Sequence, residues 1–444
     1  MNTYDLNEVF TPSSPASLTF VERTSVNYLL VEAIRTKGKQ IVIYGHSGTG
    51  KTTLLHNKLL QTYDANIVTR CTSDMSFEQL VLNAFDSLNP FYLKNKESKI
   101  TKELGATLRA DFKLISGSIN STLSNTKATS EERLVTPQLT PQKLASFFGE
   151  INSCWVIDDF HKMEQSEKKK LAQYMKVFMD ESVNYPYVKI IAIGAVGTAK
   201  EVLELDNELN NRVSEINVPF LTDIELHTIL QMGESKLNIK IDNSVKNQII
   251  KFSNGLASVT HQLAFSLCMS KDIYQTSTLY TEFDREDFRM ALSNYVITKS
   301  GYLYDRFEKA IEEPKNNHLP IYYHILKCFI ESKNPHLSTK DVFNYFHRNR
   351  HPQQEAVIEY LLKQLMSEKK GSVLDFDQQS KTWFIPDPFF RVYCVCTMNL
   401  TKQNLQAQMD LFDSEIIDLS KSKIKKEQRA LIQQAFASGE YFDF

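Results

Sequence analysis

Gly45-His46-Ser47-Gly48-Thr49-Gly50-Lys51-Thr52 stands directly after the apolar run at residues 40–44 and directly before a run typical of a helix. The stretch satisfies the pattern GxxxxGK[ST], in which the backbone N–H groups of a glycine-rich loop surround phosphates. Its glycines permit positive φ angles and let the backbone approach a ligand closely. We therefore predict that these residues, together with Thr53, bind the phosphates of a nucleotide.

Two side chains of this motif have separate predicted roles. Lys51 would supply a positive charge to the β- and γ-phosphates, and Thr52 would supply a hydroxyl ligand to Mg²⁺. The N-terminus of the helix that follows adds partial positive charge. The sequence therefore predicts ATP or ADP with Mg²⁺ as the cofactor.

A pair of carboxylates follows another apolar run, at residues 154–157. Asp158 would emerge at the carboxyl end of that strand, where α/β sheets bind ligands, and we assign it to Mg²⁺ through water. Asp159 then takes the place where many such ATPases use a glutamate to orient the attacking water. Because aspartate is a methylene shorter than glutamate, slow hydrolysis is expected. A solvated Asp-Asp turn is the alternative.

Strand-like runs alternate with helical patterns in the first half of the chain, at residues 40–44, 66–70, 154–157, 188–193 and 215–219. Continuous apolar strands bracketed by helices are typical of a parallel sheet that is covered on both faces. The predicted fold class is therefore α/β, with a doubly wound parallel sheet. Residues 116–142 are rich in hydroxyl side chains and lack aromatic ones, so they are predicted to form a mobile loop.

The rest of the chain is predicted to be mostly helical. Helical periodicity continues from residue 221 to about residue 299, and the pattern of three helices and a hairpin between residues 320 and 385 is typical of a winged helix. Cys394 and Cys396 are placed in a strand. The predicted parts are a nucleotide-binding domain at 1–220, a helical lid at 221–300, a winged-helix domain at 301–400 and a helical tail at 401–444.

Composition argues against several classes of function. The formal net charge is -2, which is unlike a protein that coats nucleic acid. No apolar run reaches the ~18 residues that span a bilayer, and the N-terminus lacks the features of a signal peptide. The cysteines have no CxxC or metal-site spacing, which favours reduced thiols. We expect a cytoplasmic protein without a membrane partner.

The order of these segments resembles the AAA+ superfamily, and within it the origin-recognition and initiator ATPases and the neighbouring STAND switch ATPases. The resemblance rests on the motif at residues 45–52, the Asp-Asp strand, the strand at 190–195 and the stretch 211–225. It covers about residues 15–400. It implies an ASCE-type P-loop NTPase core, a helical lid and a winged helix.

The resemblance also implies roles for individual residues. Val21 and Arg23, in a turn before the first strand, would lie near the adenine base. Arg212 falls where AAA+ proteins place an arginine finger that reaches a neighbouring subunit's γ-phosphate, and a surface ion pair is the alternative. His261 occupies the place of the second-sensor arginine, and a core or capping histidine is the alternative. The fourth strand lacks a polar first sensor, for which Thr198 is the nearest substitute.

The predicted function is an ATPase that acts as a switch, whose ATP-bound state favours self-association and engages a separate effector or partner protein. A bacterial defence or mobile-element system is the setting that the resemblance implies. Two alternatives stay open: a DNA-binding initiator or transposition-type regulator that assembles on duplex DNA, and a nucleotide-binding scaffold with little hydrolysis. The candidate recognition helix at 353–366 carries one lysine and two glutamates, which is a poor match to a phosphate backbone.

Overall fold

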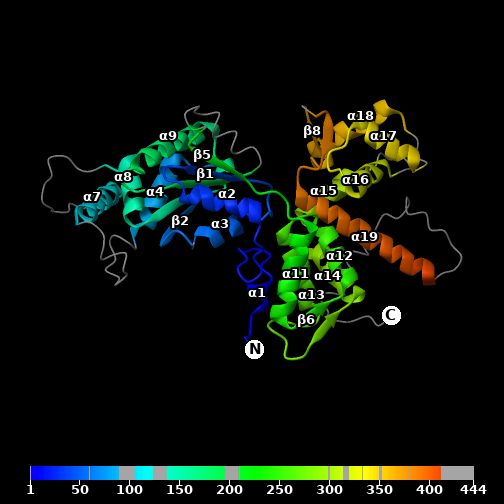
Figure 1. The fold of residues 1–444 in the computed structure, drawn as a ribbon. Helices are drawn as coiled ribbons and strands as arrows, with labels where there is room; N and C mark the ends of the chain where they lie inside the picture. Colours follow the sequence, from blue (N-terminus) through cyan, green and yellow to red (C-terminus); the bar gives the residue numbers. More distant parts are fainter. Residues whose placement is uncertain are drawn as a thin grey trace. The chain divides into compact units, whose positions relative to one another are not determined.

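The computed structural model describes residues 2–59, 61–89, 106–123, 138–195, 209, 211–298, 301–313, 320–332, 334–349, 353–378 and 380–411. The chain divides into two compact units, Met1–Arg285 and Glu286–Phe444. The first unit holds the glycine-rich motif, the sheet and the helices α11 to α13 (residues 223–269), and the second holds the remaining helices and a hairpin (Figure 1).

A five-stranded sheet forms the centre of the first unit (Figure 1). Its strands are β1 (Gln40–Tyr44), β2 (Ala65–Arg70), β3 (Ser153–Asp158), β4 (Ile190–Gly194) and β5 (Val213–Asn217). They lie in the order β2-β3-β4-β1-β5, and every neighbouring pair is parallel. Because all strands point the same way, the loops after β1 and β3 leave the sheet at the same edge. The predicted parallel α/β sheet is confirmed.

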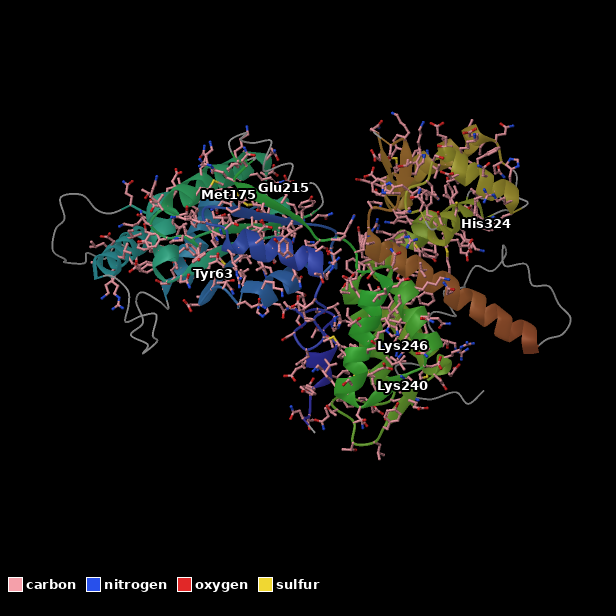
Figure 2. All side chains as sticks on the ribbon, in the orientation of Figure 1. Tyr63, Met175, Glu215, Lys240, Lys246 and His324 are labelled. Atoms are coloured by element: carbon pink, nitrogen blue, oxygen red, sulfur yellow. The ribbon has the colours of Figure 1, made fainter. Side chains whose placement is uncertain are left out.

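Helices cover both faces of this sheet, which is why its strands are apolar on both sides. Ile41 and Ile43 of β1 pack into one layer, whereas Val42 between them packs into the other. Tyr63 and Met175 belong to opposite layers (Figure 2). The helices are α2 (Thr24–Arg35) and α3 (Lys51–Leu59) on one face, and α4 (Phe77–Ser87), α7 (Ala106–Leu123), α8 (Pro141–Glu150) and α9 (Gln165–Glu181) on the other.

The mobile loop predicted at residues 116–142 is wrong at its first end. Residues 116–123 continue α7, because Phe112 and Ile115 are buried in the core and anchor a helix whose propagation costs little once it has formed. At the other end, α8 begins at Pro141, and the Thr140 hydroxyl accepts a hydrogen bond from the Lys143 N–H at 3.2 Å. The prediction for residues 124–137 falls outside the described residues.

The segment after β5, for which the sequence predicts a helical lid, is called the lid below. It consists of α11 (Asp223–Leu237), β6 (Ile239–Ile241), α12 (Asn243–Ser253), α13 (Ala257–Met269) and β7 (Thr281–Phe283). It begins with a capping box, in which Thr222 and Glu225 each accept the other's backbone N–H. Inside the lid, the ammonium of Lys246 contacts the Glu234 carboxylate at 3.0 Å, and both side chains are nearly buried. Lys246 is labelled in Figure 2.

The N-terminal segment packs on the lid, although the sequence places it with the sheet. Its short helix α1 (Leu6–Val9) contacts α11 and α13, and the ring of Phe10 lies so close to Gly233 that a side chain there would collide with it. Further along, the Ala16 carbonyl accepts a hydrogen bond from Asn57 of α3 at 2.9 Å. This segment is therefore a second connection between lid and sheet, beside the linker after β5.

The second unit has the order of elements predicted for a winged helix. Its helices are α14 (Arg285–Thr298), α15 (Tyr302–Ile311), α16 (Ile321–Glu331), α17 (Thr339–Arg348), α18 (Glu355–Leu365) and α19 (Pro388–Leu411). The strands β8 (Asp375–Asp377) and β9 (Thr382–Phe384) form an antiparallel hairpin before α19. A short 3₁₀ turn, η3 (Glu368–Lys370), follows α18, and a similar turn in the first unit, η1 (Phe160–Lys162), follows β3. Leu337 adds an antiparallel bridge to Trp383.

Helix α19 corrects one expectation about the end of the chain. Cys394 and Cys396 lie in this helix and not in a strand, and both are buried. The helix also continues through the predicted boundary at residue 400 to Leu411, and the predicted tail beyond it, residues 412–444, falls outside the described residues. None of the helices in the described ranges combines the length and the apolar character of a membrane span.

Candidate nucleotide site

The loop between β1 and α3 has the backbone shape of a phosphate-binding loop. Gly45 has a φ of 153° and lies against the Val218 carbonyl, only 2.4 Å from where a side chain would begin. Gly50 has a φ of 88°, and nothing lies within 4 Å of the place where its side chain would be. The loop therefore needs glycine at both positions, and open space borders it at Gly50.

Lys51 is held inside this loop. Its ammonium donates hydrogen bonds to the carbonyls of Gly45 and His46, each at 2.8 Å. Burial lowers the pKa of Lys51, and the charges of Asp158 and Asp159 oppose that shift. The structure thus brings the lysine and the two carboxylates together, as the sequence predicts. A positive charge beside the loop is suited to the β- and γ-phosphates of a nucleotide.

The other side chains of the loop are divided between the loop's own structure and the open side. Thr49 is buried, and its hydroxyl donates to the His46 carbonyl at 2.9 Å, so it stabilises the loop. Ser47 and Thr52 are exposed, and Thr52 lies in the first turn of α3. Thr53 is half-buried in the same turn. Thr52 is therefore free of burial and can present its hydroxyl to a metal ion that arrives with a nucleotide.

Asp158 and Asp159 follow each other at the carboxyl end of β3. Burial raises the pKa of Asp158, the charge of Asp159 raises it further, and a hydrogen bond from the Asp159 N–H at 2.9 Å opposes both. Asp159 has a φ of 59°, and its carboxylate accepts a hydrogen bond from the Lys162 ammonium at 2.7 Å. A bound divalent cation would favour the ionised form of Asp158. The donor set of Asp158 and Thr52 fits Mg²⁺.

Sequence reasoning missed two basic residues beside these carboxylates. Lys162, at the end of η1, pairs with Asp159. Arg70 is the register partner of Asp158 in the neighbouring strand, and its charge opposes the rise in the pKa of Asp158. Arg70 lies beside Asp158 only because β2 pairs with β3, so that neighbour becomes visible once the strand order is known. Lys162 is three residues after Asp159, so that pair could have been found from the spacing along the chain.

Arg23 does not lie free for a nucleotide base. Its guanidinium is buried and donates to the carbonyls of Pro219 at 2.9 Å and Phe220 at 3.2 Å. Its Nε lies 3.4 Å from the Glu225 carboxylate at the start of the lid. Arg23 therefore ties the segment before α2 to the linker after β5, and Val21 beside it is half-buried. The role of Val21 at a base stays a prediction.

Arg212 lies at the amino end of β5, whereas the glycine-rich loop follows the carboxyl end of the neighbouring strand β1. Strand β5 runs parallel to β1, with Gln40 opposite Val213 and Tyr44 opposite Asn217. Arg212 precedes β5, so it is about 15 Å from the phosphate loop at the usual strand rise of ~3.3 Å per residue. It is 63% exposed and lies 4.0 Å from the Asp180 carboxylate. It cannot reach the phosphates of its own chain.

His261 is a structural histidine of the lid, which is the alternative that the sequence left open. It is 3% exposed, and its Nδ1 accepts a hydrogen bond from the Thr11 N–H at 3.1 Å. Its ring meets that of Phe10 edge to face, with centroids 6.1 Å apart. The structure thus corrects its assignment to the cofactor: burial has committed the side chain to the N-terminal segment. Thr198, the suggested polar sensor, falls outside the described residues.

Acid is expected to release the N-terminal segment from the lid. Burial lowers the pKa of His261 to about 4, below the ordinary value of 6.5. The neutral ring therefore contributes stability that is fully present above about pH 6.5 and is lost, by about 3 kcal/mol, as the pH falls toward 4. Hydrogen-exchange protection of the Thr11 amide, measured from pH 7 to pH 4, should fall over that range.

A matched variant for this measurement is His261→Asn, which keeps an acceptor near Nδ1 but does not titrate in this range. Its Thr11 protection should be lower than in the unaltered chain at pH 7 and nearly independent of pH. Protection that follows pH equally in both proteins would contradict the assignment to His261.

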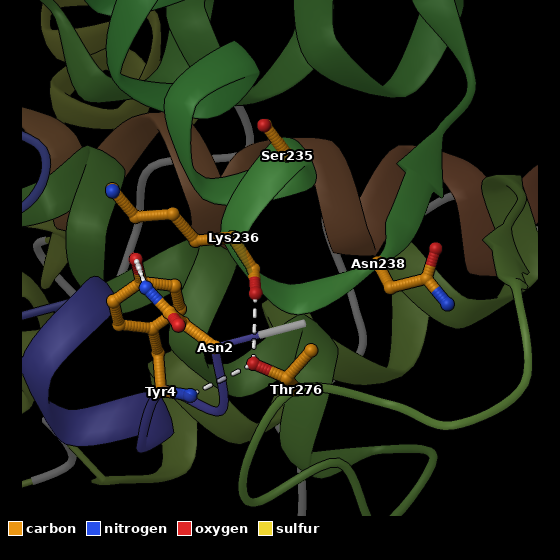
Figure 3. Close-up of a pocket in the computed structure, with 6 residues that line it drawn as sticks. All are labelled: Asn2, Tyr4, Ser235, Lys236, Asn238 and Thr276. Atoms are coloured by element: carbon orange, nitrogen blue, oxygen red, sulfur yellow. Dashed lines mark hydrogen bonds between the residues drawn. The ribbon is translucent and has the colours of Figure 1, made fainter.

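A separate polar hollow of about 260 Å³ lies between the N-terminal segment and the lid (Figure 3). The Thr276 hydroxyl joins its two sides, accepting from the Tyr4 N–H at 2.9 Å and donating to the Lys236 carbonyl at 2.8 Å. Its lining contains no residue of the glycine-rich loop or of β3. It is therefore distinct from the candidate nucleotide site.

No protein-family model matches the sequence, and no curated protein matches it either. Among solved structures, the chain is similar to a Walker-type ATPase of Pyrococcus abyssi, with a TM-score of 0.50 and 15% identity over 84% of this chain and 96% of that one. It is also similar to Cdc6p from Pyrobaculum aerophilum, at 0.41 and 12% over 90% and 98%, and to the ORC2 protein of Aeropyrum pernix, at 0.43 and 12% over 91% and 100%. At these identities the first likeness concerns the fold.

Proposed function

We propose that this chain, which has the fold of the AAA+-type P-loop ATPases, binds ATP with Mg²⁺ and hydrolyses it slowly as a molecular switch. One observation supports this most directly: the ammonium of Lys51 lies within the glycine-rich loop and close enough to Asp158 and Asp159 for their charges to act on its pKa. A triphosphate and its metal ion need this combination of lysine, hydroxyl and carboxylate.

Calorimetry with ATP, ADP and Mg²⁺ on the full chain tests nucleotide binding. We expect binding that is weakened when Mg²⁺ is removed, because Asp158 and Thr52 contact the phosphates through the metal. The absence of any heat of binding, with folding verified by circular dichroism, would overturn the proposal.

Slow turnover is favoured by the contact between Asp159 and Lys162. The residue proposed to orient water has its carboxylate engaged at 2.7 Å by a neighbouring ammonium, and both side chains are about half exposed. Such an exposed ion pair is weak, so it reduces hydrolysis without abolishing it. The scaffold alternative, with little hydrolysis, differs only in degree, and a measured turnover rate separates the two.

Self-association is proposed from the position of Arg212. This exposed guanidinium lies at the amino ends of the strands, and the loop of the same chain lies at their carboxyl ends. A role at a γ-phosphate therefore requires a second copy of the chain. Such a contact joins the loop side of one subunit to the Arg212 side of the next. It is heterologous, because two different surfaces meet, and it generates a ring or a filament. ATP bound at this contact would stabilise the assembly.

Mixing two inactive variants is expected to restore ATP turnover. Lys51→Ala removes the lysine of the loop and Arg212→Ala removes the proposed finger, so each variant alone should be nearly inactive. In a 1:1 mixture, random head-to-tail contacts join an intact loop to an intact Arg212 in about a quarter of the interfaces. Turnover should therefore recover to about that fraction. A mixture as inactive as its components would contradict action in trans.

The alternative of a DNA-binding initiator has less support in the second unit. Helix α18 exposes the apolar side chains of Val357 and Tyr360, and Met366 directly after it is also exposed. Lys363 of this helix pairs with Glu359 at 2.6 Å. Lys370 contacts the Glu312 carbonyl and the Tyr322 ring. A surface of this kind favours a protein partner over a phosphate backbone. Binding to duplex DNA whose affinity falls with salt, with a slope of several phosphates, would reverse this preference.

A separate effector protein is therefore the partner that we propose, with bacterial defence or a mobile element as the setting. Support comes from the switch-like organisation of an ATPase unit followed by a unit with an exposed apolar helix face. Size measurement of the purified chain with ADP, with a non-hydrolysable ATP analogue and with DNA reports binding, assembly and partner class together.

A further inference from the structure

The linker between sheet and lid carries an aromatic ring that lies on the phosphate loop. Phe220, two residues after the linker's buried Val218, is half-buried. Its ring stacks on the imidazole of His46, with centroids 4.8 Å apart and planes at 14°. Stacked aromatic pairs of this geometry contribute beyond the apolar area that they bury. The ring therefore joins the second residue of the loop to the start of the lid.

The Cβ of Phe220 lies close to Gly255, in the turn that follows α12. Gly255 has a φ of 78°, and a side chain placed there would begin 2.6 Å from the Cβ of Phe220. The Leu221 N–H donates to the Gly255 carbonyl at 2.9 Å. Only glycine fits at this approach. A displacement of Phe220 would therefore be passed to α12 and α13 of the lid.

The backbone of the linker is held in place by Arg23. Its guanidinium binds the carbonyls of both Pro219 and Phe220, and it pairs with Glu225 in the first turn of α11. Because Arg23 joins the linker backbone to Glu225, a displacement of Phe220 moves the linker and the start of α11 together.

The backbone of His46 also takes part in the hydrogen bonds inside the loop. Its carbonyl accepts hydrogen bonds from the Lys51 ammonium and from the Thr49 hydroxyl. A triphosphate competes for that ammonium, because its charge interacts far more strongly with Lys51 than a carbonyl does. Binding at the loop thus alters the hydrogen bonding of the residue whose ring contacts the lid linker.

We propose that Phe220 is a positioning residue that couples phosphate binding in the loop to the position of the lid through its stack on His46. The inference rests on the proposed ATP binding and adds the route by which the bound state reaches the rest of the chain. Coupling of this kind is reciprocal, so a lid held in place by Phe220 also favours the loop geometry that binds the nucleotide.

Three variants of the full chain test the coupling. Phe220→Leu keeps an apolar side chain but removes the ring, Phe220→Tyr keeps the ring, and Phe283→Leu makes the same change in β7 of the lid, away from the linker. Two quantities are measured: the dissociation constant for ATP with Mg²⁺, and the change in hydrogen exchange of residues 219–225 and 250–258 when ATP binds.

We expect Phe220→Leu to weaken ATP binding about threefold to tenfold, in keeping with the usual strength of a stacked aromatic pair. It should also remove most of the ATP-dependent change in exchange, and Phe220→Tyr should restore both properties. Phe283→Leu should raise lid exchange with and without ATP while leaving the affinity unchanged. If Phe220 had only a structural role, Phe220→Leu would behave as Phe283→Leu does, with raised lid exchange and unchanged ATP affinity.

A double substitution separates the stack from other effects. If the rings act together, His46→Ala combined with Phe220→Leu should weaken ATP binding by less than the product of the two single effects. If Phe220→Leu binds ATP as the unaltered chain does and its lid responds normally, the coupling is overturned and ATP binding stands. If the unaltered chain binds no ATP, the proposed function fails and this inference with it.

Discussion

Replacing Lys51 with alanine is expected to lower the rate of ATP turnover by a factor of about 10² or more, the usual loss when one donor to developing negative charge is removed. Two effects add in the same direction. The β- and γ-phosphates lose their nearest positive charge, and the carbonyls of Gly45 and His46 lose a shared donor that holds the loop in shape. Steady-state phosphate release at saturating ATP measures the result.

A matched control for this variant is Lys169→Ala. Lys169 is an exposed lysine of α9, so its loss changes the net charge equally without touching the loop. Turnover by this control should stay close to that of the unaltered chain. If Lys51→Ala retained more than a tenth of the activity, the phosphate site would have to lie elsewhere in the chain.

Replacing Phe148 with alanine is expected to lower the free energy of unfolding of the first unit by about 3–5 kcal/mol, because truncating a buried aromatic leaves a cavity. Phe148 is fully buried, and its ring lies 6.0 Å from that of Trp155 and 6.1 Å from that of Phe178. These rings fill the layer between the sheet and α8 and α9, where no neighbouring side chain can collapse into the gap without leaving its own contacts.

The chain's two tryptophans make this measurement specific, since Trp155 lies in the first unit and Trp383 in the second. In a Trp383→Phe background, the fluorescence of Trp155 during urea unfolding reports the first unit alone. Phe346→Ala is the matched control, because Phe346 is equally buried but belongs to the core of the second unit. It should leave the Trp155 transition in place. A Phe148→Ala transition that does not move would mean that this layer contributes little to stability.

Much of the fold could be predicted because its signals are local. The glycines at 45, 48 and 50, the apolar strands and the carboxylate pair after β3 depend on short stretches of sequence, and the structure has them in the predicted order. Local pattern failed where neighbours in space override it. The hydroxyl-rich residues 116–123 form a helix because Phe112 and Ile115 anchor it in the core, and Cys394 and Cys396 lie in α19 because that helix buries them.

The sequence by itself determined the phosphate loop, its lysine and the carboxylate strand, since each is specified by residue types at fixed spacing along the chain. Only the tertiary structure decided which side chains remain available to a ligand. Thr11 and His261 are 250 residues apart and Arg23 and Pro219 are 196 apart, yet each pair forms a hydrogen bond that commits a predicted ligand-binding side chain to holding the lid. Burial and pairing across such separations follow from how the elements pack, and no local pattern encodes them.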